Sequence, residues 1–464
     1  IRNTRLCKLS RGLGDVYKRQ VFTIGLSAYT GTLQHAGIVH PGDCAVPETA
    51  RSTPFPGWFF ALTGITVAVG SVPSQRCRMR LGSCFVKTGL PGTLNADVRV
   101  AAGRGPARSL LVLCAVFLVI SPAAVSAEDQ LAEPLRVFGD FRLRLEQDWD
   151  SLQGDGIKRD DRLRLRIRLR GGVEYQFDPH WSVKVQARSG PDLSQQSPHV
   201  TIHDFDGGST GPYEFNLDYW LVRYEKGGFE AWAGRNLPSY LHQDDLFIFD
   251  NVTYAGAGGS YTWDIDANSI YLSFNYVALP VGMRDFVGEA IISQLAWQRR
   301  FESGIFSAGI GYRLSNGDPD DPAGATLLTD NSARDYREWN LQLQYRTEWL
   351  DQPLLLGVDV MHNAADYDNA PPDSFTDFHR DDVNGYVAEV LLGGKEPGDW
   401  QFGYFYSNVE ALASNSSYIQ DDWVRWGNAN QVRATNLRGS ELRVLYTWRE
   451  NFNVFARLFF VDAV

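Results

Sequence analysis

One run of nine residues, 162–170, constrains the fold of this chain more than any other segment. Each even position from Arg162 to Arg170 is arginine, and each odd position between them is leucine or isoleucine. A period of two indicates a β-strand, because successive side chains point to opposite faces of a pleated backbone. One face of this strand is aliphatic and the other carries five cations. A membrane-spanning barrel uses both faces, with aliphatic side chains against lipid and charged side chains around a wet interior.

The chain after residue 127 holds fifteen predicted strands, and several of them alternate as clearly. In 338–350, Trp339 and Leu341 alternate with Asn340 and Gln342. A soluble sheet is the competing interpretation, but five arginines on one face would then usually lie among compensating surface acids. The predicted strands are 135–146, 162–177, 180–189, 214–225, 228–236, 253–263, 269–279, 288–301, 303–314, 338–350, 353–364, 383–393, 399–410, 438–449 and 452–463.

The connections between these strands alternate between short and long. Short ones, such as Lys226-Gly227 and Glu450-Asn451, consist mostly of residues that favour hairpin turns. The alternation predicts an all-β fold, a transmembrane antiparallel up-and-down β-barrel of about sixteen strands, with turns in the periplasm and loops outside. The long connections are 147–161, 190–213, 237–252, 315–337, 365–382 and 411–437, and most are rich in Asp, Asn, Ser, Gly and Pro.

The strand count suggests that one strand is missing. Bacterial single-chain barrels have even numbers of strands, whereas fifteen are predicted here. Such barrels normally end in a strand with a terminal aromatic residue, which Asp462-Ala463-Val464 does not provide. We therefore expect the chain to be truncated before a sixteenth strand. A miscount by one strand is the alternative.

The chain divides into two parts of opposite charge at residue 127. Residues 1–127 carry a net charge of +10 and all five cysteines, whereas residues 128–464 carry −21 and no cysteine. A cysteine-free chain suits an oxidising envelope compartment. Residues 1–97 show no sustained strand or helix period, so we expect them to be spurious upstream translation or disordered. Residues 128–464 are expected to be the barrel.

Residues 98–127 are predicted to be a secretory signal peptide. Arg104 and Arg108 precede an apolar run at 110–120, and small residues up to Ala127 fit a cleavage site. The apolar run is shorter than the roughly 20 residues of a membrane-spanning helix. A membrane anchor is the competing interpretation. After export and cleavage behind Ala127, the remaining chain is expected in the bacterial outer membrane.

Six short motifs follow one another along the first strands and loops. They are FGDFRLR at 138–144, RLRLRIRLRGGVEY at 162–175, HWSVKVQAR at 180–188, NLDYWLVRY at 216–224, AGRNLP at 233–238 and FDN at 249–251. In this order they resemble a family of proteobacterial outer-membrane porins, and less closely the alginate-export-like barrels. The resemblance covers 134–464 and implies an outer-membrane β-barrel channel. Because sixteen-stranded porins are commonly trimers, the resemblance also suggests a homotrimer.

The arginine face is the first candidate for a pore lining. A row of cations would favour anionic solutes, whereas arginines paired with acids on other strands would only brace the wall. The predicted basic lining consists of Arg142, Arg144, Arg162, Arg164, Arg166, Arg168 and Arg170. The candidate acids are Asp140, Glu146, Asp218, Glu230, Asp359, Glu389 and Glu441.

The third long connection, 237–252, is unusually apolar for a loop in water. Leu246, Phe247, Ile248 and Phe249 are adjacent in it. A loop folded inward against the barrel wall would bury these side chains and form a constriction. Contact with a neighbouring protomer is the alternative.

Metal sites and enzyme signatures find little support in the sequence. Acids cluster at 318–321, 381–382 and 421–422, where outer loops could hold Ca²⁺ or Mg²⁺, but no ligand spacing of a known loop motif is present and solvated charge is the alternative. His199 and His203, with Asp204, could suggest a metal or be incidental neighbours. No catalytic motif of a hydrolase or phosphate-binding enzyme occurs. We expect no cofactor and no metal.

The predicted function is passive diffusion of small hydrophilic solutes through an outer-membrane porin. One alternative is a substrate-specific or export channel for anionic sugars or organic acids. Another is a structural or adhesive barrel with a closed pore. The expected partners are outer-membrane lipid, lipopolysaccharide and the solutes. Nucleic acid is not expected, because the basic run lies on an aliphatic-backed strand of an acidic chain.

Overall fold

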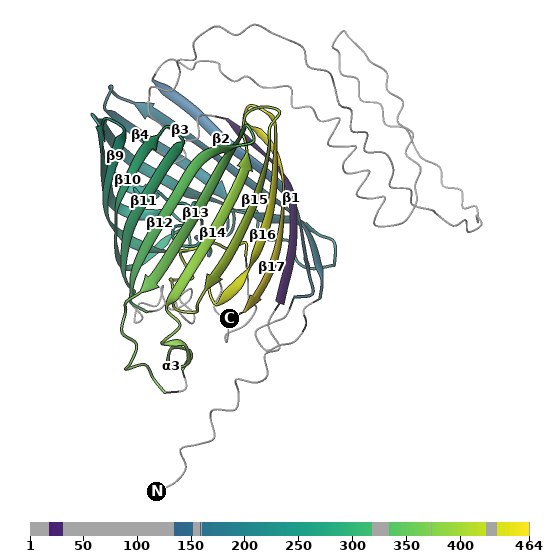
Figure 1. The fold of residues 1–464 in the computed structure, drawn as a ribbon. Coiled ribbons are helices and arrows are strands. Elements are labelled where there is room, and N and C mark those ends of the chain that lie inside the picture. The colour runs from purple at the N-terminus through teal and green to yellow at the C-terminus, as the bar shows by residue number, and fades with distance from the viewer. Residues whose placement is uncertain are drawn as a thin grey trace, which may run out of the picture. The chain divides into compact units, whose positions relative to one another are not determined.

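The chain forms a closed antiparallel β-barrel in the computed structural model (Figure 1). Within the described residues, seventeen strands form one sheet. The predicted fold class, an antiparallel barrel of about sixteen strands, is confirmed. The predicted signal peptide at 98–127 and its cleavage site at Ala127 lie outside the described residues. The structure describes residues 18–30, 134–151, 158, 160–317, 334–372, 374–423 and 434–463.

Sixteen of these seventeen strands have 8 to 17 residues, and β5 has only 5. No helix in the described part of the chain is long and apolar enough to cross a bilayer. The strands are β1 (Lys18–Thr30), β2 (Leu135–Trp149), β3 (Arg162–Gln176), β4 (Trp181–Ser189), β5 (Val200–Asp204), β6 (Phe215–Lys226), β7 (Phe229–Asn236), β8 (Tyr254–Ile265), β9 (Asn268–Val281), β10 (Asp285–Phe301), β11 (Gly304–Asn316), β12 (Tyr336–Trp349), β13 (Gln352–Asn363), β14 (Asn384–Gly393), β15 (Trp400–Val409), β16 (Leu437–Arg449) and β17 (Phe452–Ala463), and the short helix α3 (Phe375–His379) precedes β14.

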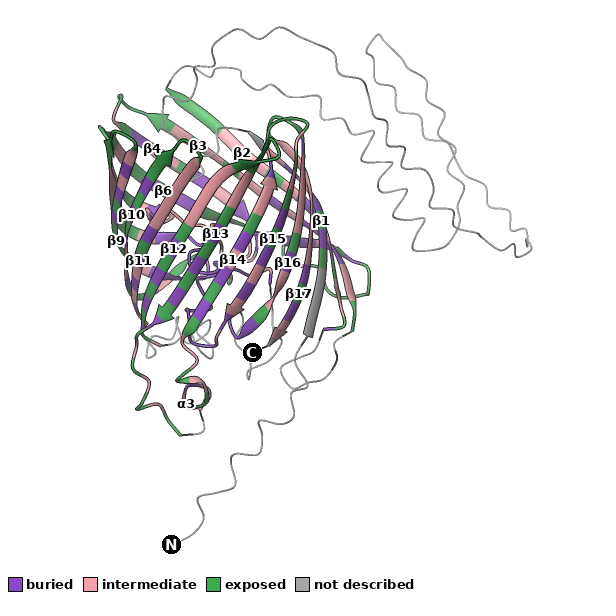
Figure 2. Ribbon diagram, viewed as in Figure 1, coloured by how far each residue is buried: buried purple, intermediate pink, exposed green. Residues whose placement is uncertain are grey.

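Side chains alternate between the two faces of the barrel wall, and the outer face is apolar. On β12, Trp339 and Leu341 are each 46% exposed, whereas Asn340 between them is 1% exposed. On β3, Arg166 and Arg168 are buried. Figure 2 shows this alternation of buried and more exposed positions along the strands. A soluble protein buries its aliphatic face, so the reversed pattern indicates an outer surface that contacts an apolar medium.

The two ends of the barrel differ in their connections. Hairpins such as Gly227-Gly228 and Leu350-Asp351 close one end, which we call the short-turn end. Backbone φ is positive at all four residues (57°, 82°, 52° and 59°), as two-residue turns between twisted strands require. The long connections lie at the opposite end, the long-loop end. An exception there is the three-residue turn 282–284, because β9 and β10 extend further than predicted.

Two strands lie outside the predicted set. β5 interrupts the predicted loop 190–213 and pairs with β3, and its five residues are too few to show a period. β1 comes from residues that the sequence analysis leaves out of the fold, and it pairs antiparallel with both β17 and β2. It lies between β17 and β2 and so closes the wall. The alternation of Phe22, 37% exposed, with Thr23, 4% exposed, fits this place in the wall.

Candidate functional site: the barrel interior

The arginine ladder faces the barrel interior; it consists of the seven predicted arginines, Arg142 and Arg144 on β2 and Arg162, Arg164, Arg166, Arg168 and Arg170 on β3. The register places Arg144 directly opposite Arg166, and Arg142 directly opposite Arg168. Like charges at directly opposed positions repel each other. Arg144, Arg166 and Arg168 are also at most 4% exposed. The ladder therefore depends on nearby acids for its stability.

Glu146 pairs with three arginines in the middle of the ladder. Its carboxylate lies 2.8 Å from Arg144 and 3.2 Å from Arg166, and it forms a third ion pair with Arg164. Glu146 is itself 3% exposed, so these charges interact in a medium of low dielectric constant, where losing one partner is costly. Glu146 is one of the acids that the sequence offers as candidate partners for the arginines.

Acids also hold the two ends of the ladder. Asp140 accepts a hydrogen bond from Arg168 at 2.9 Å, and its other oxygen lies 3.7 Å from Arg170. Arg162 pairs with Asp204 on β5 at 2.6 Å. Asp140 is thus one of the predicted acids that the structure brings to the ladder. Asp204 was considered only as a metal ligand, because the short strand that carries it was not predicted.

The other predicted acids lie elsewhere on the inner wall. Within the described residues, Asp359 and Glu389 form no ion pair with lysine or arginine, although Asp359 accepts a hydrogen bond from Gln342 at 3.2 Å. Three predicted acids pair with arginines outside the ladder: Asp218 with Arg188 at 3.9 Å, Glu230 with Arg223 at 3.8 Å, and Glu441 with Arg443 and Arg457, both at 2.7 Å.

Two separate arcs of the inner wall carry ionisable groups of opposite kinds. Strands β16, β17, β1, β2, β3 and β4 follow one another around the barrel and carry the ladder together with Arg188, Arg443 and Arg457. Strands β13 and β14, in another part of the wall, carry Asp359 and Glu389, which are 0% and 4% exposed. The arginine-bearing strands thus form a cationic arc of the inner wall, and β13 and β14 form a separate carboxyl arc.

Loop 237–252 folds into the barrel. The backbone N–H groups of Ser239 and Leu241 donate to the side chains of Asn275 on β9 and Gln294 on β10, both at 2.8 Å. The Tyr240 hydroxyl donates to Asn340 on β12, also at 2.8 Å. Side chains of three wall strands thus satisfy polar groups of the loop, which would otherwise lose their hydrogen bonds with water.

The apolar residues predicted to form a constriction lie in this inward loop. Leu246 and Phe247 are 1% exposed, Ile248 is 3% exposed and Phe249 is 5% exposed. They belong to an apolar cluster that includes inward-facing side chains of the wall. These apolar side chains are therefore buried by residues of the same chain.

Glycines in the wall leave space for the loop. A Cβ atom at Gly311 would overlap the Tyr240 hydroxyl, and one at Gly357 would lie 2.5 Å from the Gln243 amide nitrogen and 2.6 Å from Glu389. The loop can approach β11 and β13 this closely only because these positions have no side chain. The sequence contains these glycines, but only the strand register shows that they lie opposite the apolar loop.

A second loop, 410–423, also folds into the barrel, which the sequence analysis did not predict. Residues 411–420 are at most 6% exposed. Gln195 and Gln196, in the connection before β5, donate at 2.8 Å to the carbonyl oxygens of Ser417 and Ser416. A sequence signal consistent with this burial is that 411–420 holds no charged residue.

The acid pair 421–422 is not solvated, contrary to the alternative considered from sequence. Asp422 pairs with Arg144 at 2.9 Å and with Arg457 at 2.8 Å, and Asp421 is 8% exposed. Burial of the loop carries these acids to the cationic arc. Of the other acid clusters, 318–321 lies outside the described residues, and Asp382 pairs with His379 at 2.7 Å.

The residues considered for a metal do not converge. His199 is 6% exposed, and burial together with the nearby Arg144 and Arg166 holds its pKa well below the usual range, so the ring is neutral. The His203 ring packs against Phe205 with centroids 4.5 Å apart, while Asp204 pairs with the ladder. Among the described residues, no group of three or more His, Cys, Asp or Glu side chains is arranged to hold a metal ion.

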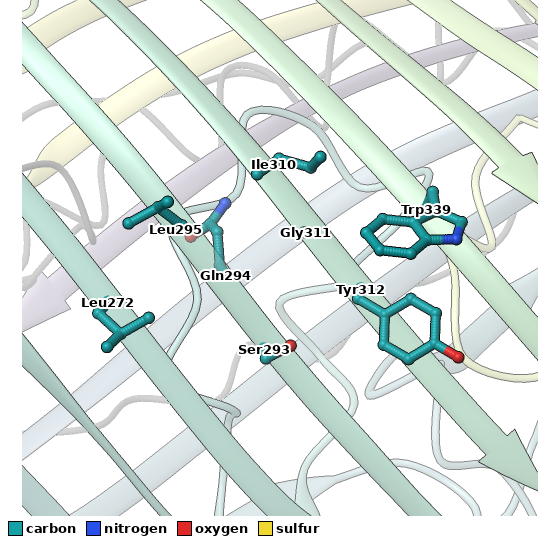
Figure 3. A pocket seen from close by; sticks show the side chains of 8 residues that line it. All are labelled: Leu272, Ser293, Gln294, Leu295, Ile310, Gly311, Tyr312 and Trp339. Atoms are coloured by element: carbon teal, nitrogen blue, oxygen red, sulfur yellow. The ribbon is translucent and has the colours of Figure 1, made fainter.

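An apolar hollow of about 280 Å³ lies on the outer wall between β9 and β12. Figure 3 shows Ile310 and Tyr312 on either side of Gly311, with Trp339 beside Tyr312. The rings of Tyr312 and Trp339 are 4.7 Å apart, and Leu295 borders the hollow on β10. Because these side chains lie on the apolar outer face, the hollow does not belong to a path through the barrel.

Comparison with known proteins does not identify a family. No family model and no curated protein match the chain. The solved structures similar to it include bacterial outer-membrane porins at low sequence identity. They include Pseudomonas putida OprB at high pH (13% identity, TM-score 0.40, 71% of this chain and 93% of that chain), Salmonella typhi OmpF in complex with daunomycin (10%, 0.36, 71% and 97%) and a mutant of the Rh. blastica porin (11%, 0.36, 71% and 99%).

Proposed function

We propose that this chain is an outer-membrane channel through which small hydrophilic solutes diffuse passively. The observation that carries the proposal is the polarity of the barrel wall, which is apolar outside and lined inside by arginine, carboxylate and amide side chains. A closed sheet pairs its backbone polar groups internally, as the hydrocarbon core of a bilayer requires. A polar interior offers water and solutes a path that the bilayer does not.

Aromatic side chains near the short-turn end support the membrane location. Tryptophan and tyrosine are enriched where a membrane meets water, and outer-membrane barrels carry such aromatic girdles. The lengths of the connections would place the short turns in the periplasm and the long loops outside, toward lipopolysaccharide. The exposed aromatic residues of this ring are Trp181, Phe229, Trp263, Phe301, Trp349, Trp400 and Trp448.

We propose that the arginine ladder mainly braces the wall. Among the described residues, at least six of its seven arginines lie within 4.0 Å of a carboxylate oxygen. Pairing reduces the net positive potential of the ladder. We therefore do not expect the ladder to make the channel strongly selective for anions. The narrower role of a channel for anionic sugars or organic acids stays a prediction. We further propose that loop 237–252 narrows the path, because it crosses the interior between the two arcs.

Single-channel current in a planar lipid bilayer tests the proposal. The purified full chain would be inserted under a KCl gradient, and its folding checked by heat-modifiable migration in a gel. A stable conductance is expected, and the sign of the reversal potential would show whether potassium or chloride passes more easily. Folded, inserted protein that carries no current would contradict the channel.

A closed barrel with a structural or adhesive role is the second candidate. The burial of 411–420 favours it, because a loop packed this tightly fills the interior. Shortening loop 410–423 separates the two functions. If the shortened variant conducts and the full chain does not, the loop closes a channel. If neither conducts, the barrel has a structural or adhesive role and does not transport solutes.

A further inference from the structure

Uncharged polar side chains form a patch on the inner wall of β10, β11 and β12. We call Gln298, Ser307 and Gln344 the amide patch. The register pairs Gln298 with Ser307, and Ser307 with Gln344, so the three side chains lie side by side across neighbouring strands. Each follows the inward period of its strand. The patch therefore lies on the face that a solute in the barrel would meet.

Small residues leave a recess beside the amide patch. In the adjacent row of the sheet, Ala296 pairs with Gly309, and Gly309 pairs with Gln342. The recess has a volume of about 70 Å³, and residues 241–243 of the inward loop bound it. A few water molecules fit in this volume. One edge of a small solute can replace those waters while the rest of the solute stays in the path.

The polar groups of the amide patch are available to a ligand. Within the described part of the chain, no hydrogen bond or ion pair engages the side chains of Gln298, Ser307 or Gln344. Their neighbours differ, because Gln294 donates to Gln342 at 2.9 Å and both help to hold the inward loop and the wall together. Two free amides and a hydroxyl offer donors and acceptors next to each other.

The recess holds no carboxylate. Arg346 is the only charged side chain among those that line it, apart from the titratable ring of His242. The arginine ladder lies on β2 and β3, which are not neighbours of these strands. A neutral solute with several hydroxyl groups can exchange its bonds to water for bonds to amides at little net cost, whereas a cation or a multiply charged anion would lose hydration that Arg346 alone cannot replace.

We infer that the amide patch binds neutral polyhydroxylated solutes of the size of a monosaccharide as they pass through the barrel. The inference rests on the proposed channel function, because a solute reaches the patch only through the interior. It assigns the channel a solute class that differs from the anions suggested by the arginine ladder.

The test is a titration of the single-channel KCl current with glucose. Glucose is expected to reduce the current saturably, and permethylated glucose, which keeps the ring but has no hydroxyl donor, is expected to act far more weakly. In Gln298→Leu/Gln344→Leu, the glucose concentration for half-reduction should rise about tenfold, because two neutral hydrogen bonds are lost. Gln401→Leu is the matched control, since Gln401 lies on β15 away from the recess.

The outcomes separate the patch from the channel. A KCl current that glucose does not reduce, or an equal titration in the wild type and the double variant, overturns the amide patch and leaves the channel intact. No current from the inserted wild type overturns the channel and the patch with it. If the double variant does not fold, Gln298→Asn and Gln344→Asn replace it; each withdraws its amide by one methylene, and no change in half-reduction in either overturns the patch.

Discussion

Arg313 on β11 and Glu338 on β12 form an ion pair in which both side chains are 0% exposed. Arg313 also donates to the Phe247 carbonyl oxygen at 2.8 Å and to the Ser414 hydroxyl at 2.6 Å. Its guanidinium lies 4.8 Å from the centre of the Phe247 ring. Glu338 accepts a further hydrogen bond from the Asn415 backbone at 3.0 Å. One buried pair thus holds both inward loops, 237–252 and 410–423, against the wall.

Replacing Arg313 with methionine is expected to release both loops. Glu338 would remain as a buried charge without its arginine, which typically costs about 3 to 5 kcal/mol. The single-channel current should become larger and noisier, and the thermal unfolding midpoint should fall. Arg136→Met is the control, because Arg136 is 47% exposed and lies 3.9 Å from Glu174, in a pair worth at most about 1 kcal/mol. A current in Arg313→Met equal to that of the wild type would show that the pair does not hold the loops.

Glu146→Gln is expected to make the channel more selective for anions. The substitution removes one negative charge beside Arg144, Arg164 and Arg166 while it keeps the size of the side chain. The reversal potential under a KCl gradient should move toward the chloride potential. Glu348→Gln, an exposed position at the short-turn end, serves as the control and should leave the reversal potential unchanged. An unchanged potential in both variants would place the ladder outside the ion path.

The attachment of loop 237–252 is expected to weaken as pH rises. Asp244 in this loop lies beside Asp359 and Glu389, and burial raises the pKa of Asp244 to about 6 from 3.8. The attached loop therefore binds a proton that a detached loop releases at about pH 4. Through Asp244, attachment is strongest below about pH 4 and weakens as pH rises through about 6.

Current noise measured from pH 4 to 7 tests this prediction. The noise should increase over this range in the wild type and should be flatter in Asp244→Asn, which keeps an uncharged side chain at every pH. Asp381→Asn, on the exposed side of another loop, should behave like the wild type. Equal pH profiles in Asp244→Asn and the wild type would exclude Asp244 as the group responsible.

Local alternation predicted the strands and the faces of the barrel because both depend on neighbouring residues. A strand of period two directs alternate side chains to opposite faces wherever it lies, so the inward direction of Arg164 and the outward direction of Leu341 follow from the sequence alone. The acids that pair with the arginine ladder do not follow from the sequence alone. Asp422 reaches Arg144 from 278 positions away along the chain, and only the packing of loop 410–423 brings it there.

The burial of the inward loops was likewise predictable only where it depends on neighbouring residues. Adjacent apolar residues, Leu246 to Phe249, indicated burial of the first loop because their exposure to water is unfavourable. The second loop holds small and polar residues such as Ser416 and Ser417, whose burial depends on Gln195 and Gln196 more than 200 positions earlier. β1 was missed for a different reason, since the surrounding residues show no sustained period and were left out of the fold.

Gly311→Ala is expected to displace Tyr240 from the wall. The new Cβ atom would overlap the Tyr240 hydroxyl, which donates to Asn340 at 2.8 Å. The loss of this bond and the displacement of a buried ring should lower the thermal midpoint and widen the path. Gly171→Ala on β3 is the matched control, because no atom lies within 4 Å of its added Cβ. If the displaced ring is the cause, Gly311→Ala should have little further effect in a Tyr240→Ala background.

Removal of residues 1–30 is expected to prevent the barrel from closing. β1 pairs with β17 from Lys18 to Ala28 and with β2 from Gln20 to Thr30, so its loss leaves two strand edges without partners. Unpaired backbone groups at an edge cost several kcal/mol each in a bilayer. Refolding into detergent, followed by gel migration with and without heating, measures closure, and removal of residues 1–17 is the control. A chain that starts at Glu128 and still becomes heat-modifiable and conducting would show that β1 is dispensable, as cleavage after Ala127 requires.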